Sequence, residues 1–353
     1  MKVSVVVPCY NVAAYVGRAL LSLANQSLHD IEIICVNDAS TDGTLAVLKE
    51  CARLDLRIRI IENDKNMGVG PTRNRGIDAA RGEYVAFLDA DDWVESTFLE
   101  KLVHAAEKYK LPVVCSEVVI HSPDGKIFKK DRNDIKKNFH YFAYAWSGLY
   151  RRGFLNRYNI HFPDLCLGED SVFESIVKCY VDKPIRLVRG AIYHYCKRLG
   201  SLETQVFNTK QINDFCSAFI QIMDIYNSAQ NISINDYRAG LNRHWFYLFK
   251  KIYFCDAACQ EKLAKTACDA FARLAYMPDA VYKSYALQVA LSSKSVSGVI
   301  DVLFSTRWFE NEYKLFGVIP FARVRYNKLN KRVFFCGIKV LDRVISAHAH
   351  TDQ

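Results

Sequence analysis

Three carboxylates occupy four consecutive positions, 89–92, in the stretch FLDADDW, as Asp89, Asp91 and Asp92. Like charges this close repel one another and lose hydration, so they persist mainly where a cation, a donor-rich ligand or open water compensates them. In an extended segment alternate side chains share a face, which would place Asp89 and Asp91 together. That pair suits a hard divalent ion that keeps other positions for water and a diphosphate. A helix N-cap or a turn remains open as the alternative, because aspartate is favoured at both.

A second acidic pair, Glu169 and Asp170, stands directly before a helical pattern. Apolar residues at three- and four-residue spacing make one face of that helix, namely Val172, Phe173, Ile176, Val177 and Tyr180. A carboxylate here could remove a proton from a hydroxyl, and a helix start favours its ionised form. Asp170 could equally cap the helix, a role worth about 1 kcal/mol. On these grounds either residue could be the base.

Apolar runs and helical patterns alternate through the first part of the chain. The apolar runs cover 2–10, 31–38, 57–64 and 83–91, and the helical patterns cover 12–26, 44–54, 70–82 and 95–109. Strands interleaved with helices of this length predict βαβ units and a mostly parallel sheet covered on both faces. The fold class is therefore α/β. Such sheets bind ligands beyond the carboxyl ends of their strands, where polar residues stand at 8–11, 37–42, 63–66 and 89–92.

Five motifs give the chain a resemblance to a known family. They are VVVPCYN at 5–11, VNDASTDGT at 36–44, NMGVGPTRNRGI at 66–77, FLDADDW at 87–93 and LGED at 167–170. Over residues 1 to about 205 the chain resembles the family 2 glycosyltransferases of the GT-A fold, particularly bacterial enzymes that build surface polysaccharides such as lipopolysaccharide and capsule. The resemblance implies inverting transfer of a sugar from a nucleotide diphosphate, with UDP-sugar as the donor and Mg²⁺ or Mn²⁺ as the cofactor.

The resemblance also implies where the donor binds. In the family pattern the segments after the first and second strands hold the base and ribose, which here are Pro8, Tyr10, Asn11 and Asp38. Arg73 should approach the nucleotide, Asp89 the ribose or a metal-bound water, and Asp91 the metal itself. Taken alone, Asp38 is nearly as well explained as a turn residue and Arg73 as a solvated surface residue. Many relatives have Asp where this chain has Asn37.

The acceptor side follows from the same resemblance. The second acid of the family's E-D pair is the usual base, which assigns Asp170, with Glu169 contacting the acceptor or orienting the site. Trp146 and Gly148 lie where relatives place acceptor contacts, although a buried tryptophan is the commoner explanation. His194 is a candidate third metal ligand or a packed core histidine. Lys197, Arg198 and Ser201 are candidates for the diphosphate or a solvated basic edge.

The pattern changes after about residue 210. Helical stretches at 211–227 and 237–254 predict a mainly helical second domain over 211–305, following a nucleotide-sugar domain over 1–210. From Tyr313 to Leu341 the chain has seven basic residues and no acidic one. This segment, within 306–353, could form strands or lie on a surface. With its aromatic residues it suits an anionic membrane surface better than nucleic acid if the acceptor is a lipid-linked glycan.

The composition and the apolar runs argue against a membrane-spanning, a secreted or a disulfide-linked protein. The chain has 353 residues, of which 50% are hydrophobic and 24% charged, with a net charge of +9. No apolar run reaches the roughly 18 residues of a spanning helix, and Pro8 interrupts the apolar start, so a cytoplasmic protein is expected, and the basic segment predicts peripheral attachment at the inner face of the membrane. The twelve cysteines form no C-x-x-C pair and are expected to be reduced.

Other functions with a similar layout fit less well. A sugar nucleotidyltransferase lacks its Gly-rich basic signature, because PCYNVAAYVGR follows the first strand. A dinucleotide oxidoreductase lacks a G-x-G-x-x-G at that place. A binding module that kept the fold but lost turnover stays open, although the retained D-x-D and E-D pairs argue against it.

Overall fold

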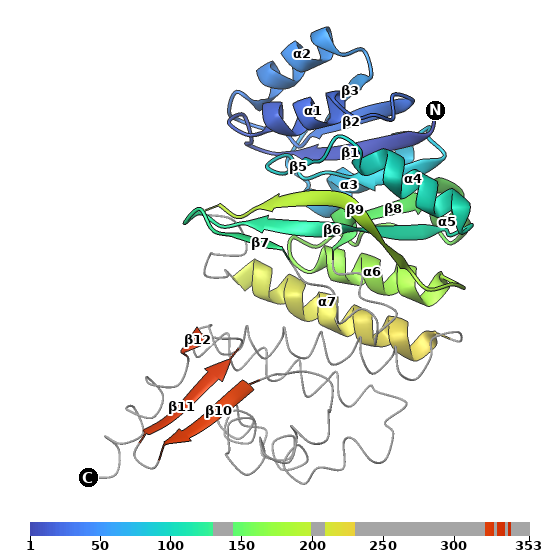
Figure 1. Cartoon of the computed structure of the whole chain (residues 1–353). Coiled ribbons are helices and arrows are strands. Elements are labelled where there is room, and N and C mark those ends of the chain that lie inside the picture. The colour runs from blue at the N-terminus through green and yellow to red at the C-terminus, as the bar shows by residue number, and fades with distance from the viewer. Residues whose placement is uncertain (130–143, 199–208, 230–321, 328–329, 336–337, 340–353) are drawn as a thin grey trace. The chain divides into compact units, whose positions relative to one another are not determined.

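The computed structural model describes residues 1–129, 144–198, 209–229, 322–327, 330–335 and 338–339 (Figure 1). The chain divides into two compact units, Met1–Ala275 and Tyr276–Gln353. The predicted domain boundaries at 210 and 305 stay predictions, and position 305 lies outside the described residues. Among the described residues no helix is both long enough and apolar enough to cross a membrane.

The described residues of the first unit form nine strands in one sheet. They are β1 (Val3–Cys9), β2 (Ile31–Asn37), β3 (Ile58–Glu62), β4 (Tyr84–Phe87), β5 (Trp93–Val94), β6 (Val113–His121), β7 (Ile127–Lys129), β8 (Gly148–Arg151) and β9 (Arg186–Cys196). The helices are α1 (Val16–Ala24), α2 (Thr44–Leu54), α3 (Val69–Ala79), α4 (Phe98–Lys108), α5 (Arg152–Arg157), α6 (Glu169–Tyr180) and α7 (Thr209–Ser228), with a 3₁₀ turn, η2, at Ala145–Ser147. The predicted α/β class is confirmed.

The sheet has the order β3-β2-β1-β4-β8-β6-β9-β5, with β7 paired to β6. β1 pairs in parallel with β2 and β4, β2 with β3, and β6 with β9. The other pairs, β4 with β8, β6 with β8, β5 with β9 and β6 with β7, are antiparallel. The parallel half was predicted from the alternation of strands and helices. The antiparallel half was not, because β8 enters the sheet from far along the chain.

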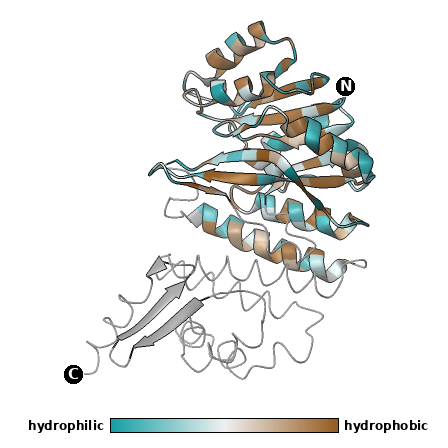
Figure 2. Cartoon of the chain, in the orientation of Figure 1, coloured by the Kyte–Doolittle hydropathy of each residue, from teal (hydrophilic) through white to brown (hydrophobic). Residues whose placement is uncertain are grey.

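Burial explains why the parallel strands form. Every residue of β2 and of β4 is buried, as expected for strands covered on both faces. Helix α3 packs on β1 and β2, α4 packs on β6 and β9, and α7 lies along α6 (Figure 1). In Figure 2 both α6 and α7 carry brown and teal bands, as amphipathic helices do. The helix predicted at 211–227 is thus confirmed as α7, whereas the pattern at 237–254 lies outside the described residues.

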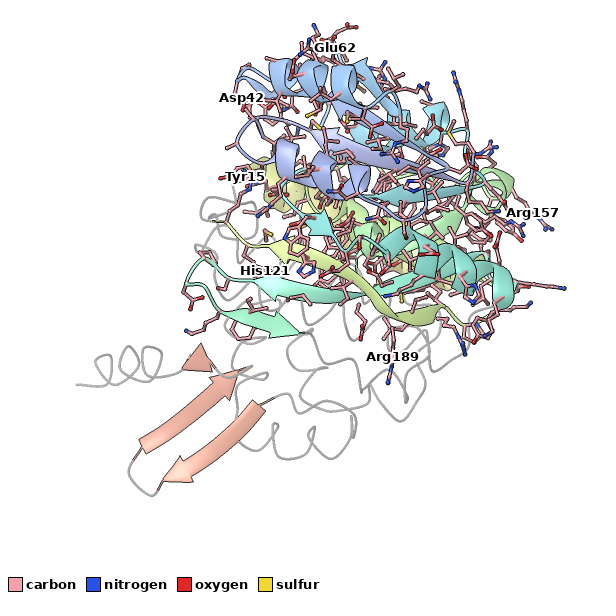
Figure 3. The ribbon with its side chains drawn as sticks, turned by 45° about the horizontal axis from the view of Figure 1, so that its top comes forward. Tyr15, Asp42, Glu62, His121, Arg157 and Arg189 are labelled. Carbon is pink, nitrogen blue, oxygen red and sulfur yellow. The ribbon has the colours of Figure 1, made fainter. Side chains whose placement is uncertain are left out.

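The register brings the predicted polar segments to one edge of the sheet. Cys9 pairs with Asn37 in the β1–β2 ladder, and Val6 pairs with Phe87 in the β1–β4 ladder, so these strands end side by side. Figure 3 shows Tyr15, Asp42 and His121 along this edge, whereas Arg157, which ends α5, lies on the opposite side. The carboxyl edge therefore carries the motifs at 8–11, 37–42 and 89–92.

The second unit is described only in part. Strands β10 (Ala322–Asn327), β11 (Asn330–Phe335) and β12 (Ile338–Lys339) form an antiparallel sheet of their own. The sequence left open whether this basic segment forms strands or lies on a surface, and strands are present at these residues. Binding of this segment to a surface stays a prediction.

Candidate active site

The carboxylate stretch after β4 is a turn rather than an extended strand. The amide of Asp92 donates to the carbonyl of Asp89 at 3.0 Å, which closes the turn before β5 begins at Trp93. The expectation that Asp89 and Asp91 share the face of an extended segment is therefore wrong. The chain turns here because β5 leaves in a different direction to pair with β9. The two side chains instead have different cationic partners, Arg73 and Arg198.

Arg73, on α3, joins the two acidic motifs. Its Nη2 lies 2.8 Å from Oδ1 of Asp89, and its Nη1 lies 2.6 Å from Oδ1 of Asp170 and 3.3 Å from Oε1 of Glu169. The side chain is only 3% exposed, and its guanidinium lies 5.2 Å from the ring centroid of Phe162. Residues that are 16 and 97 positions away along the chain thus meet on one guanidinium, which has five donors in a fixed plane. A contact of Arg73 with a nucleotide stays a prediction.

The start of α6 presents the E-D pair to Arg73. Gly168 takes the N-cap position with φ of 89°, a left-handed conformation that favours glycine, and a Cβ there would meet the Cβ of Ala218 at 2.7 Å. Asp170 is the second residue of the helix, and no side chain caps the helix start. The alternative that Asp170 serves as the N-cap is therefore wrong. Its side chain is 26% exposed and faces Arg73.

The segment before α6 is tied to the helix that carries Arg73. The side chain of Asn74 accepts from the amide of Phe162 and donates to its carbonyl, both at 2.8 Å. Gly70 lies so close that a Cβ would meet the carbonyl oxygen of Pro163 at 2.7 Å. α3 and the approach to the E-D pair are therefore held as one piece, which fixes Arg73 relative to Asp170.

Burial and charge act against each other on these acids. Burial raises the pKa of Asp170 well above that of an ordinary aspartate, Arg73 opposes the rise, and Glu169 adds to it. Burial also raises the pKa of Glu169, again opposed by Arg73. Burial alone would lower the pKa of Arg73, but the facing carboxylates of Asp170, Asp89 and Glu169 raise it. Arg73 therefore stays a cation, and the carboxylates depend on it to remain ionised.

Asp91 lies on the other side of the turn, against basic residues. Its Oδ2 is 2.7 Å from Nε of Arg198, whose guanidinium lies 5.2 Å from the ring centroid of Tyr15. Arg18 on α1 donates to the carbonyl oxygen of Asp91 at 2.6 Å. Burial and the charge of Asp89 raise the pKa of the Asp91 carboxyl, and Arg198 lowers it. Two basic side chains, Arg18 on α1 and Arg198 after β9, therefore lie against the turn.

The predicted nucleotide-binding residues gather at the ends of β1 and β2. Asn11 has φ of 50°, its side chain accepts from the amide of Thr41 at 2.9 Å, and its own amide donates to Ser40 at 3.1 Å. Tyr10 is 46% exposed, and Pro8 is half-buried. These contacts join the loop after β1 to the loop after β2 and leave the ring of Tyr10 toward solvent.

Asp38 has structural partners. It is 3% exposed and accepts from Nδ2 of Asn63 at 2.6 Å and from the amides of Met67 and Gly68 at 2.9 and 3.0 Å. The carboxylate thus shapes the loop that leads into α3. Binding of a nucleotide base by Asp38 stays a prediction, to be made alongside these three internal hydrogen bonds.

Two further predicted residues are packed inside the protein. His194 stacks on Trp93 with ring centroids 3.5 Å apart, and its Nδ1 and Nε2 lie 2.8 Å from His121 and 3.0 Å from Glu95. Both ring nitrogens therefore have partners other than Asp91, and the role of His194 as a metal ligand stays a prediction.

Trp146 is equally enclosed. It is 4% exposed and stacked on Tyr144 and Tyr193, with ring centroids 4.6 and 4.2 Å away. This burial matches the alternative of a core tryptophan better than a face open to a sugar. Gly148 is buried at the start of β8.

The donor set can be compared with what a divalent cation requires. Among the described residues no group of three or more His, Cys, Asp or Glu side chains surrounds a common point. Asp91, however, is 22% exposed and already faces a cation, Arg198. Mg²⁺ is commonly held by one or two carboxylates together with water and substrate phosphate. The residues therefore fit an ion that binds together with a diphosphate.

Sequence reasoning missed Arg18 and Tyr193 and left Asp92 without a role. Arg18 stands in an ordinary helical pattern, and no local signal places it against Asp91. The hydroxyl of Tyr193 donates to Asp92 at 2.8 Å and accepts from the amide of Asp89 at 3.1 Å. Only the pairing of β5 with β9 brings these residues together.

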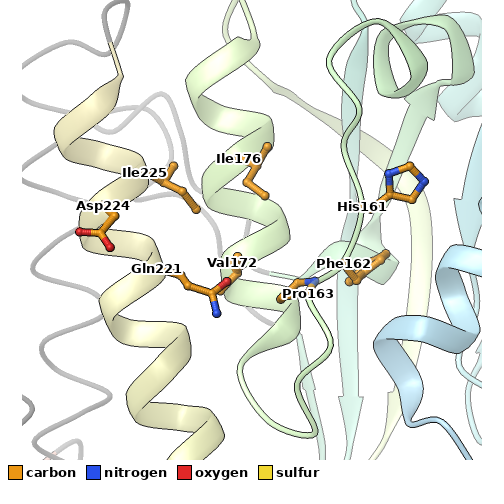
Figure 4. Close-up of a pocket in the computed structure, with 8 residues that line it drawn as sticks. All are labelled: His161, Phe162, Pro163, Val172, Ile176, Gln221, Asp224 and Ile225. Carbon is orange, nitrogen blue, oxygen red and sulfur yellow. The ribbon is translucent and has the colours of Figure 1, made fainter.

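Two cavities lie outside this carboxylate site. One of about 380 Å³ lies between α6, α7 and the segment 161–163, lined by His161, Phe162, Pro163, Val172, Ile176, Gln221, Asp224 and Ile225 (Figure 4). The other, of about 200 Å³, is lined by Asn66, Met67, Gly68, Asp164, Cys166, Lys210 and Asp214. None of the predicted site residues lines either one.

Comparison with solved structures agrees with this fold. A crystal structure of S. aureus TarS 1-349 in complex with UDP-GlcNAc superimposes with a TM-score of 0.71 at 21% sequence identity, covering 95% of this chain and 97% of that chain. At this identity the likeness concerns the fold, which is the GT-A arrangement expected from the motifs.

Comparison with curated proteins identifies relatives. The succinoglycan biosynthesis protein ExoO of Rhizobium meliloti is 30% identical over 220 residues, which is 57% of this chain and 62% of ExoO. The cholesterol galactosyltransferase of Borreliella burgdorferi is 28% identical over 291 residues, 75% of this chain and 80% of that protein. The chain spans 62% of the length of the first curated relatives that it matches.

The family model for glycosyl transferase family 2 matches residues 4–180, a stretch that includes the nucleotide-side loops, the Asp89–Asp92 turn, Arg73 and the E-D pair. This chain belongs to glycosyl transferase family 2.

Proposed function

We propose that the protein is an inverting glycosyltransferase that moves a sugar from a UDP-sugar to a hydroxyl of a glycan or lipid-linked acceptor. The observation that carries this proposal is the placement of Arg73 between Asp89 and Asp170, which puts the carboxylate turn and the E-D pair on two sides of one site. Direct displacement requires that arrangement, because the leaving diphosphate and the attacking hydroxyl stand on opposite sides of the anomeric carbon.

Asp170 is the proposed base. Arg73 binds its Oδ1, and we assign Oδ2 as the oxygen that takes the proton from the acceptor hydroxyl. As that proton moves, the acceptor oxygen bonds to the anomeric carbon, and the bond from that carbon to the diphosphate breaks with its electron pair leaving on the diphosphate. One attack from the far side inverts the configuration. Glu169 shares Arg73 and is the proposed acceptor contact.

The donor side is proposed to use the rim of the sheet. Pro8, Tyr10 and Asn11 would bind the base and ribose, with Asp38 holding the loop at Met67 and Gly68 in place. Asp91 would hold a divalent ion, Mn²⁺ or Mg²⁺, with Asp89 contacting the ribose or a metal-bound water, and the ion when bound supplies charge stabilisation for the diphosphate. Arg198, now paired with Asp91, would be available to the diphosphate once another cation takes its place.

Asp91→Ala is expected to abolish metal-dependent UDP binding, because it removes the carboxylate that we assign to the ion. The measurement is titration of UDP with Mn²⁺ present and with EDTA. Asp78→Ala is the control, since Asp78 lies on α3 with 68% exposure and pairs with His161 at the surface. If Asp91→Ala binds UDP as the unsubstituted chain does and keeps the same Mn²⁺ dependence, the metal assignment is wrong.

We also propose a role in polysaccharide assembly at the inner membrane surface. ExoO is named a succinoglycan biosynthesis protein and the Borreliella relative a cholesterol galactosyltransferase, and these names support a glycan or lipid-linked acceptor for this chain. Seven cations and no acid between Tyr313 and Leu341 suit an anionic surface, where each contributes about 1 kcal/mol.

The expected result is that the chain sediments with phosphatidylcholine vesicles containing phosphatidylglycerol at low salt, and that deletion of residues 313–353 prevents this. Vesicles of phosphatidylcholine alone are the control, since they lack surface charge. Equal sedimentation with and without residues 313–353 would remove the membrane proposal and leave the catalytic one intact.

The donor is tested directly by a screen of nucleotide sugars for metal-dependent UDP release. Slow hydrolysis of the correct donor needs no acceptor. Release from at least one UDP-sugar, lost in EDTA, is the expected result. Tight binding of UDP without release from any sugar nucleotide would indicate the binding module instead.

A further inference from the structure

The Asp89–Asp92 turn is mounted on β9 by a closed chain of hydrogen bonds. The amide of Asp89 donates to the hydroxyl of Tyr193 at 3.1 Å, and that hydroxyl donates to Oδ2 of Asp92 at 2.8 Å. Oδ1 of Asp92 accepts from the amide of Cys196 at 2.7 Å. The turn and the end of β9 are thus connected through one carboxylate and one phenol.

Both side chains are enclosed, so their bonds do not exchange with water. Asp92 and Tyr193 each have 0% exposure. Burying a carboxylate or a phenol costs free energy unless its hydrogen bonds are made. Removing one partner leaves the other buried without a hydrogen bond. Asp92 is therefore not placed to touch a ligand itself. Its hydrogen bonds to Tyr193 and Cys196 explain why Asp92 is present, although the proposed chemistry of the site does not use its carboxylate.

The same connection sets the place of Arg198. Arg198 follows Cys196 by two residues, and its Nε is 2.7 Å from Asp91. Arg18 strengthens the link from outside, because one Nη2 donates both to the carbonyl of Asp91 at 2.6 Å and to Sγ of Cys196 at 3.3 Å. These contacts join the turn that carries Asp89 and Asp91 to the strand end that carries Arg198. A shift of one therefore shifts the other.

We propose that Asp92 and Tyr193 are positioning residues for the cation site, holding Asp89 and Asp91 in the geometry that binds a divalent ion with the donor diphosphate. This rests on the proposed function for the identity of the ligand. Partners one layer behind metal ligands typically change metal affinity or activity 10- to 100-fold when they are removed. Tyr193 reaches the turn through the amide of Asp89 and through Asp92, so its hydroxyl is the atom to remove.

Tyr193→Phe tests the proposal with little change in packing, because the ring that stacks on Trp146 is kept. The full chain is titrated with Mn²⁺ in the presence of UDP, and free Mn²⁺ is followed by electron paramagnetic resonance. The expected result is an approximately 10-fold weaker Mn²⁺ affinity. Tyr150→Phe is the matched control, since Tyr150 also has 0% exposure and its hydroxyl donates to the carbonyl of Ala145 at 2.8 Å, which is not part of the turn.

Thermal unfolding of the metal-free proteins separates positioning from general damage. Both tyrosine variants lose a buried hydroxyl and are expected to lower the melting temperature by similar amounts, whereas only Tyr193→Phe weakens Mn²⁺ binding. Asp92→Asn serves as a second variant with the same outline as aspartate and is expected to weaken Mn²⁺ binding as well. Equal Mn²⁺ affinities in Tyr193→Phe and Tyr150→Phe would overturn the proposal, as would an unsubstituted chain that binds no Mn²⁺.

Failure of the proposed function has a different signature. If the unsubstituted chain binds Mn²⁺ and UDP but turns over no sugar nucleotide, while Tyr193→Phe still weakens Mn²⁺ binding, glycosyl transfer is wrong and the positioning role stands. If turnover is found and Tyr193→Phe leaves both turnover and Mn²⁺ affinity unchanged, the reverse holds.

Discussion

Asp170→Asn is expected to lower the rate of sugar transfer by about 10²- to 10⁴-fold, the usual share of a general base. UDP affinity should stay unchanged, because Asp170 lies on the far side of Arg73 from the carboxylate turn. The asparagine carbonyl can still accept from Arg73 at the 2.6 Å position, so the fold should be kept. The measurement is steady-state transfer together with a UDP titration.

Glu169→Gln is the companion variant for that experiment. Glu169 shares the guanidinium at 3.3 Å rather than 2.6 Å and is assigned to the acceptor, so its variant should raise the KM for acceptor more than it lowers kcat. Normal transfer by Asp170→Asn would show that another group takes the proton. A large loss in Glu169→Gln alone would move the base to Glu169.

The proposed role of Asp170 as the base predicts a pH dependence of sugar transfer. The proposed base would work only as a carboxylate, and burial raises the pKa of this carboxyl well above the usual range while Arg73 opposes the rise. Activity should therefore fall on the acid side at a higher pH than an ordinary aspartate would give. Replacing Arg73 would move that acid limb to still higher pH, because the opposing charge is gone.

Arg73→Met is expected to destabilise the fold by about 3 kcal/mol, the cost of leaving buried charges without their partner. Arg73 is 3% exposed and is shared by three carboxylates, on Asp89, Glu169 and Asp170, which would then face one another. The folded-state pKa values of Glu169 and Asp170 would rise further above their unfolded values. The penalty should then be largest at neutral pH and shrink as the pH falls, since the folded state takes up protons.

Urea unfolding at pH 7.5 and at pH 5.5 checks that expectation. Arg53→Met is the control, because Arg53 and Glu50 form an ion pair at the surface with exposures of 74% and 57%, and such pairs contribute little. Arg73→Lys keeps the positive charge but not the planar fork, so it should recover part of the stability and little of the transfer. A loss that is the same at both pH values would argue that Arg73 acts through packing on Phe162 rather than through charge.

The parallel part of the fold follows directly from local patterns. The apolar run at 31–38 became β2 at Ile31–Asn37, and the helical pattern at 44–54 became α2 at Thr44–Leu54. Strand and helix periodicity are local properties, and the sites at the strand ends follow from them. The position of β8 between β4 and β6 depends on pairing across distant segments, which leaves no local signal.

In the candidate site too, one part could be predicted from the sequence and the rest depends on contacts between distant residues. Motif resemblance placed Asp91 and Asp170 in one functional unit, but nothing in the sequence predicted that Arg73 would contact both Asp89 and Asp170, which lies 97 positions from Arg73. The expectation that alternate side chains share a face was wrong for Asp89 and Asp91, because it assumes an extended chain. The chain turns there to reach β5. His194 lies on β9 and Trp146 stacks on Tyr193 of the same strand, so pairing of distant strands decides the burial of both rings.

A crystal structure of the full chain with UDP and Mn²⁺ tests the central claim most directly, because anomalous scattering locates the ion. The account predicts an Mn²⁺ peak coordinated by Asp91 and the diphosphate, with Asp170 facing the same cleft from the other side of Arg73. An ion or a UDP molecule bound away from Asp91, or an Asp170 carboxylate with no open path to the diphosphate, would contradict it.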